Sequence, residues 1–135
     1  MRLYALLSIF FFGLCCCGAA QEINHSFLAC GQATYIMGED GKQSWSYPAA
    51  TRDGYVLDDG TIVLTLNKSE RYTGGAVVSI KPDGTETLVW KGTQSEVNSA
   101  QPTAAGTFVL TEAGERPRLL EITPNGEVLV EFSLA

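Results

Sequence analysis

Two stretches of this chain, GTIVLT at residues 60–65 and GTFVLT at residues 106–111, are identical at five of six positions. They begin 46 residues apart, and each runs from a glycine into an apolar, β-branched segment. Self-similarity at a period of roughly 40 to 50 residues is typical of stacked supersecondary units. The repeat therefore predicts that the same strand occurs at the same place in two neighbouring units.

A second signal comes from three Asp-Gly or Asn-Gly turns, whose glycines are Gly41, Gly84 and Gly126. Their spacings, 43 and 42 residues, agree with the first repeat. Such dipeptides between apolar runs indicate hairpins, because the favoured two-residue turns need positive φ at their central residues. No helical spacing follows the N-terminal segment, so we predict an all-β fold.

The flanks of these three turns agree in phase. Residues six and four before each glycine, and four and six after it, are apolar, and alternate residues of a strand share a face. They are Tyr35, Met37, Trp45 and Tyr47, then Val78, Ile80, Leu88 and Trp90, then Leu120, Ile122, Val130 and Phe132. We expect each hairpin to bury this face between packed units; the residues after the turns that we place there are Trp45, Leu88, Trp90, Val130 and Phe132.

Together with the hairpins at Gly60 and Gly106, these turns give units of four strands. The first unit lacks its first strand, so the predicted units are an incomplete one at 24–48 and complete ones at 49–92 and 93–135. Four-stranded units of this period predict a partial β-propeller of about three antiparallel blades. A solenoid or a sandwich is the alternative.

The DGxxxW turn and the GxxVLT strand resemble those of secreted bacterial propellers, the broad group with arylsulfotransferase-like, pyrroloquinoline-quinone-like and NHL-type repeats. The resemblance covers residues 25–133 and rests on structural motifs, so it implies a fold more than an activity. Propellers close with about four to eight blades. The resemblance thus implies that further blades, or self-association, complete a ring.

Residues 1–20 have the layout of a signal peptide: one positive charge at Arg2, an apolar run and then small residues. We expect cleavage before Gln21 and a secreted or periplasmic protein with no membrane span after cleavage. A lipoprotein signal, with a lipid anchor at Cys17, is one alternative, and an uncleaved anchor is another.

Composition narrows the classes of partner and chemistry. The formal net charge is −6, which disfavours nucleic acid and anionic membrane surfaces. His25 is the only histidine, so we expect no histidine-based metal site, no cofactor and no catalytic constellation within this chain. Cys30 is the only cysteine after the signal segment, which leaves no partner for an internal disulfide.

The candidate ligand site lies just before the first strand of each complete unit. Counted back from the turn glycines, Arg52 and Asp53 align with Asn98 and Ser99. Equivalent positions in a ring surround one axis, so these four side chains are predicted to converge and bind a polar small molecule or glycan. The alternative is that Asp53 and Asn98 satisfy loop backbone groups.

The loops after the second strands are the next candidates, because they carry Arg71, Arg116 and Arg118. The predicted function is an exported propeller binding module that is part of a larger propeller. The alternatives are a fragment of a propeller enzyme (hydrolase, transferase or quinoprotein-like oxidoreductase) with its catalytic residues on other blades, and a structural repeat without a ligand. The resemblance implies histidines at an arylsulfotransferase channel, where this chain has Arg52, Asp53, Asn98 and Ser99 instead.

Overall fold

The computed structural model describes residues 25–135, and all regular structure in this part of the chain is β-strand, which confirms the all-β prediction. The predicted signal segment, the Gln21 cleavage site and Cys17 lie outside the described residues. No helix long and apolar enough to cross a membrane occurs among residues 25–135.

The strands form three antiparallel sheets of three, four and four strands, each made of strands consecutive in the chain. The first sheet contains β1 (Phe27–Ala29), β2 (Thr34–Met37) and β3 (Gln43–Tyr47). The second contains β4 (Thr51–Val56), β5 (Ile62–Leu66), β6 (Ala76–Ile80) and β7 (Glu86–Lys91). The third contains β8 (Glu96–Pro102), β9 (Phe108–Ala113), β10 (Arg118–Ile122) and β11 (Val128–Ser133).

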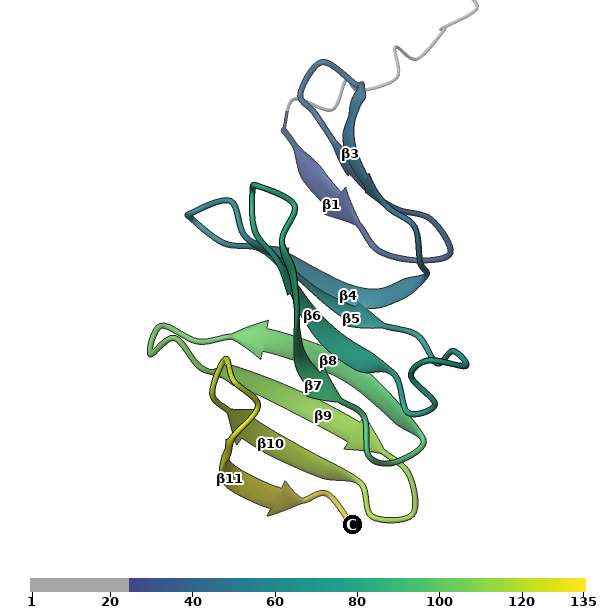
Figure 1. Cartoon of the computed structure of the whole chain (residues 1–135), viewed down its shortest axis with the longest axis vertical. Helices are drawn as coiled ribbons and strands as arrows, with labels where there is room; N and C mark the ends of the chain where they lie inside the picture. Colours follow the sequence, from purple (N-terminus) through teal and green to yellow (C-terminus); the bar gives the residue numbers. More distant parts are fainter. Residues whose placement is uncertain (1–24) are drawn as a thin grey trace, which may run out of the picture.

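The three sheets are stacked along the long axis of the molecule, with the second sheet in the middle (Figure 1). One apolar cluster joins the second sheet to the first, and a separate cluster joins it to the third. All five residues of β5 are buried, because both faces of this sheet are covered. The continuous apolar run of the repeated strand has this physical cause.

The repeated hairpins have the same turn. Gly60 and Gly106 have φ values of 81° and 78°, a region that residues with a Cβ rarely adopt. In the first turn the Leu57 N–H donates to the Thr61 carbonyl oxygen at 2.8 Å, and in the second Thr103 donates to Thr107 at 2.9 Å. The prediction that one hairpin occurs twice is confirmed.

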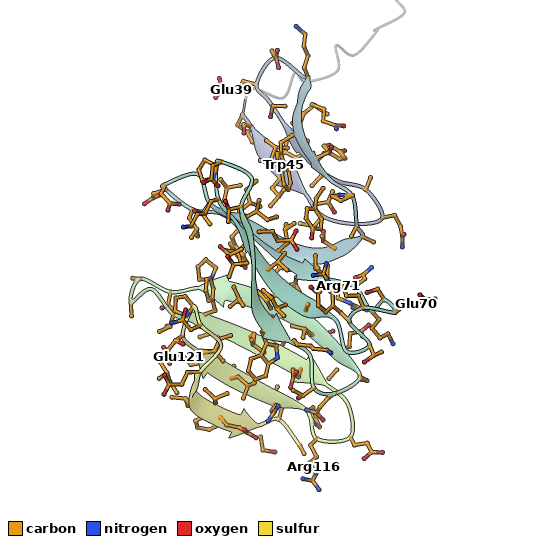
Figure 2. All side chains as sticks on the ribbon, in the orientation of Figure 1. Glu39, Trp45, Glu70, Arg71, Arg116 and Glu121 are labelled. Atoms are coloured by element: carbon orange, nitrogen blue, oxygen red, sulfur yellow. The ribbon has the colours of Figure 1, made fainter. Side chains whose placement is uncertain are left out.

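Each hairpin at the Asp-Gly and Asn-Gly turns contains a β-bulge, so the phase predicted after the turns is wrong for the residues beyond it; Leu88, which lies before its bulge, pairs with Val78 as predicted. Because of the bulge in the first hairpin, Trp45 pairs with Ile36 and lies on its face of the sheet, not on the face of Tyr35 and Met37. One extra residue reverses the side-chain alternation of every residue beyond it. Trp45 packs against the second sheet as expected, and Figure 2 shows it between these two sheets.

The expected burial of the last residues of the hairpins is also only partly found. Trp90 packs against the apolar cluster between the second and third sheets. Leu88, Val130 and Phe132, in contrast, are 45%, 42% and 66% exposed. Leu88 lies on the edge strand β7, and the other two lie on β11, an edge strand whose residues are all exposed.

A close backbone approach holds the loop 67–75 to the linker 92–95. The Gly92 N–H donates to the Gly75 carbonyl at 2.9 Å, and the Val97 N–H donates to the Gly74 carbonyl at 2.9 Å. A Cβ added to Gly74 would lie 2.7 Å from the Gly92 carbonyl oxygen, closer than real contacts of this kind. Glycine at position 74 is therefore required by this contact.

Candidate functional site

Arg52 and Asn98 occupy equivalent β-bulges. In β4 the pairing skips from Thr51 to Asp53, which leaves Arg52 as the extra residue, and in β8 it skips from Val97 to Ser99, which leaves Asn98. Strands β4 and β8 contact each other as the first strands of neighbouring sheets. The alignment of the two positions by sequence is thus matched by the backbone, and both side chains are exposed.

The four predicted residues differ in what they contact. Arg52 Nη2 donates to Glu96 Oε1, so this guanidinium is held in an ion pair. Asp53 Oδ1 accepts from the Gly54 N–H at 2.9 Å, and Ser99 Oγ lies 3.1 Å from Thr111 Oγ1. Asp53 and Ser99 are half-buried and hydrogen-bonded locally, which leaves Arg52 and Asn98 as the exposed members.

The partner of Arg52 joins this bulge to the loop 67–75. Lys68 Nζ lies 4.0 Å from the same Glu96 oxygen that accepts from Arg52. Glu96 thus lies between two cations, and Lys68 also lines the neighbouring cavity. Sequence analysis did not single out Glu96, although it lies only two residues before the aligned Asn98.

A cavity of about 320 Å³ lies between the first sheet and the loop 67–75 of the second. Its lining residues are Tyr47, Pro48, Ala49, Ala50, Leu66, Asn67, Lys68, Ser69, Arg71, Tyr72 and Glu86. The loop that forms one wall is closed by its own hydrogen bonds, including Tyr72 N–H to Ser69 Oγ at 3.1 Å. Figure 2 shows Glu70 and Arg71 on this loop, at one edge of the stack.

Some polar groups around this cavity have partners within the chain and one has none among residues 25–135. Tyr47 donates its hydroxyl to Glu86 Oε2 at 2.9 Å, and burial together with this carboxylate raises the pKa of the tyrosine. The Arg71 guanidinium lies 4.9 Å from the centre of the Tyr72 ring, a cation–π geometry. Asn67 Oδ1 is buried and has no hydrogen-bond partner among residues 25–135. A buried carbonyl oxygen without a donor is costly, so a ligand hydroxyl or amine there would gain a hydrogen bond.

A network of buried polar groups occupies the junction of the second and third sheets. Glu112, 1% exposed, accepts from Trp90 Nε1 at 2.9 Å and from the Thr93 N–H at 2.8 Å. Arg118 donates to the same carboxylate from Nε at 3.0 Å and from Nη2 at 2.9 Å, and its Nη1 donates to Glu131 at 3.0 Å. These groups satisfy one another, so the network joins the second sheet to the third.

The charges of this network are set by opposing effects. Burial alone would raise the pKa of Glu112, but hydrogen bonds from Thr93, Trp90 and Arg118 outweigh it and hold that pKa below its usual range. Burial alone would lower the pKa of Arg118, whereas Glu112 and Glu131 raise it overall. The sequence interpretation placed Arg118 in a loop, but it lies in β10 as part of this ion pair.

Within residues 25–135, no group of three or more histidine, cysteine, aspartate or glutamate side chains is arranged to hold a metal ion.

No protein-family model matches this chain, and no curated protein matches it. Among solved structures it is similar to a protein of unknown function from Bacteroides caccae, with a TM-score of 0.62 and 20% sequence identity. The match covers 78% of this chain and 39% of that one, so the matched part is well under half of its structural neighbour. The likeness shows a shared arrangement of sheets.

Proposed function

We propose that this chain is an exported binding module, part of a β-propeller, and that it holds a polar small molecule or glycan at the loop end of its sheets. The observation that carries the proposal is the cavity of about 320 Å³ lined by Asn67, whose buried Oδ1 has no hydrogen-bond partner among residues 25–135. Ligand sites are typically concave and largely apolar, with a few fixed polar groups that orient the ligand.

The lining chemistry favours a hydroxyl-rich ligand. Tyr47 offers ring surface, while Asn67 offers an amide and Glu86 a carboxylate. A sugar has apolar ring faces and hydroxyls that donate to such acceptors, so both of its surfaces have counterparts here. Lys68 and Arg71 add positive charge at the rim, which suits an acidic sugar.

The bulged residues extend the site toward β8. Arg52 and Asn98 are exposed at equivalent positions, and Lys68 connects Arg52 with the cavity through Glu96. In the proposed ring, these bulges line the mouth of the channel, with Asp53 and Ser99 fixing the strand geometry behind them. An acidic group of the ligand would compete with Glu96 for Arg52 and Lys68.

The propeller part of the proposal is supported by the repetition of the sheets and by the size of the structural neighbour. The three sheets stack in chain order, and each of the two complete ones begins with a bulged strand. The coverage figures make the neighbour about twice as long as this chain. A chain of that length has room for about six such sheets, within the range in which propellers close.

The test is saturation-transfer NMR with glucose, galactose, N-acetylglucosamine and glucuronate as probes. At least one sugar should receive saturation from the wild-type chain, and Asn67→Ala should weaken its binding about tenfold because a buried hydrogen bond is lost. Lys42→Ala is the matched control, since this lysine lies on the turn of the first sheet with its side chain 83% exposed.

Arg52→Ala separates the two parts of the site. It should weaken glucuronate about tenfold or more and leave a neutral sugar unchanged, because only the acidic group meets the guanidinium. Absence of binding for all four sugars, or binding that Asn67→Ala leaves intact, would contradict the proposal.

A further inference from the structure

The outer faces of the first and third sheets carry apolar residues at the positions that are buried between the sheets inside the stack. Between the sheets, one face of the second sheet uses Val63, Val77 and Trp90 to pack on the third. Counted from the turn glycines, the equivalent residues of the third sheet are Val109, Leu119 and Phe132, which we call the trailing face. The strand pairing agrees, since Val77 pairs with Trp90 and Leu119 with Phe132.

The opposite end of the stack shows the complementary set. The second sheet meets the first through Ile62, Leu64, Val78 and Ile80. The third sheet meets the second through Phe108, Leu110, Leu120 and Ile122. The equivalent residues of the first sheet are Phe27, Ala29, Tyr35 and Met37, which we call the leading face.

An aromatic residue lies six residues after each of the turn glycines Gly41, Gly84 and Gly126. Tyr47 packs on the second sheet, and Trp90 packs on the cluster shared with the third. Phe132 has the same pairing but is 66% exposed. Exposure of a large apolar residue at a slot that is covered twice elsewhere in the chain indicates that a sheet covers it in the assembled state.

We propose that a second copy of this chain covers the trailing face, with its leading face packed on Phe132, Leu119 and Val109. The occupant is a second copy because this chain itself carries both halves of the contact, in the registers of its two internal junctions. Two chains of three sheets close a ring of six, a number within the propeller range. This interface is independent of the ligand proposed above, and either can fail without the other.

Such a contact is head-to-tail, so it joins different patches on the two chains. A charge on either face should break it. Phe132→Glu disables the trailing face, and Met37→Glu disables the leading face, so each variant alone should be a monomer. In a mixture, the intact trailing face of the Met37→Glu chain meets the intact leading face of the Phe132→Glu chain, so one of the two contacts of the ring remains and a heterodimer weaker than the wild-type dimer should form.

The experiment is size-exclusion chromatography with light scattering on the purified full chain. The wild type should have twice the mass of one chain, and each single variant should weaken association about thirtyfold or more, as loss of a central interface residue does. Leu88→Glu is the matched control, because this leucine is 45% exposed but lies on the middle sheet. It should remain a dimer.

Circular dichroism on each variant establishes that the monomers are folded, and Tyr35→Glu replaces Met37→Glu if the latter unfolds. A monomeric wild type would overturn the proposal and indicate that a sheet from another chain or from further residues covers the trailing face. Dimers that persist in Phe132→Glu, or a mixture that associates no more tightly than each variant alone, would also overturn it.

Discussion

The two junctions between sheets use the same slots and fill them differently. Counted from the turn glycines, the corresponding residues of the first and second junctions are Tyr47 and Trp90, Ala50 and Thr93, Leu66 and Glu112, and Ala76 and Arg118. At the second junction these side chains form the hydrogen-bonded network around Glu112. At the first junction they are smaller or apolar, and three of the four line the cavity.

The difference teaches how this fold makes room for a ligand while keeping the pairing of its strands. Thr51 pairs with Leu66 in the second sheet as Val97 pairs with Glu112 in the third, next to equivalent bulges. The strand pairing is therefore the same, whereas the side chains and the loop after the second strand differ: residues 67–75 connect β5 to β6, and residues 114–117 connect β9 to β10. At the first junction Leu66 and Ala76 take the places of the Glu112–Arg118 ion pair, and the longer loop forms one wall of the cavity.

The largest expected effect is that of Glu112→Leu, which gives the second junction the residue of the first. The substitution leaves the Arg118 guanidinium, the Trp90 indole N–H and the Thr93 N–H without their shared acceptor. We expect the free energy of unfolding to fall by about 3 kcal/mol, the cost of removing one partner of a buried ion pair. Urea unfolding measures it.

The double variant Glu112→Leu with Arg118→Ala reproduces both members of the first junction. Removing the orphaned guanidinium should recover about 1 kcal/mol or more of the loss, because the two sites are coupled. Additive losses in this cycle would show that the two junctions are not interchangeable in the way described.

A smaller effect is expected from truncating the aromatic residue of each junction. Trp90→Ala should cost about 2 to 3 kcal/mol, since the ring is partly buried and its N–H binds Glu112. Tyr47→Ala should cost about 1 kcal/mol, because this ring borders an existing cavity and its hydroxyl bonds an exposed carboxylate. Thermal unfolding measures both; equal losses of stability would contradict the distinction between a filled second junction and an open first junction.

The smallest effect is the acid response of the second junction. The pKa of Glu112 is lowered in the folded chain, so its contribution to stability is present above the unfolded pKa, near 4.5, and is lost as pH falls through the folded value. The urea midpoint of the wild type should therefore decrease below about pH 4.5. Glu112→Gln should flatten this decrease, and an unchanged slope would show that other carboxylates cause it.

Much of the fold could be predicted because glycine turns and apolar runs are local signals. The repeated hairpins at Gly60 and Gly106, and the all-β class, follow from the sequence for this reason. The faces after the later turns could not be predicted, because no residue type at Ser44, Val89 or Leu129 specifies the bulge that occurs there.

For the candidate site, the sequence predicted which positions are equivalent in the two sheets but not which side chains contact one another. Counting from the turn glycines correctly aligned Arg52 with Asn98 as equivalent positions. That Glu96 is the partner of Arg52 depends on how the two sheets stack, which the sequence does not show. The burial of Glu112 had one available signal. The repeated strands differ just after their shared VLT, where the second sheet has Leu66 and the third has Glu112. On the neighbouring strand the third sheet has Arg118 where the second has Ala76, so an acidic and a basic residue are introduced together.

The contact between Gly74 and Gly92 makes one wall of the cavity and the start of the third sheet into a single cooperative unit. Release of the loop 67–75 would break the hydrogen bonds to Gly92 and Val97, and with them the register at which β8 begins. The first sheet has one backbone bond of the same kind, from the Thr51 N–H to the Gly31 carbonyl at 2.9 Å, together with its apolar cluster and the Thr34–Thr51 hydroxyl contact of 2.8 Å. Local unfolding of the first sheet would thus open the cavity from one side and leave the other two sheets joined, as expected of foldons in a repeat array.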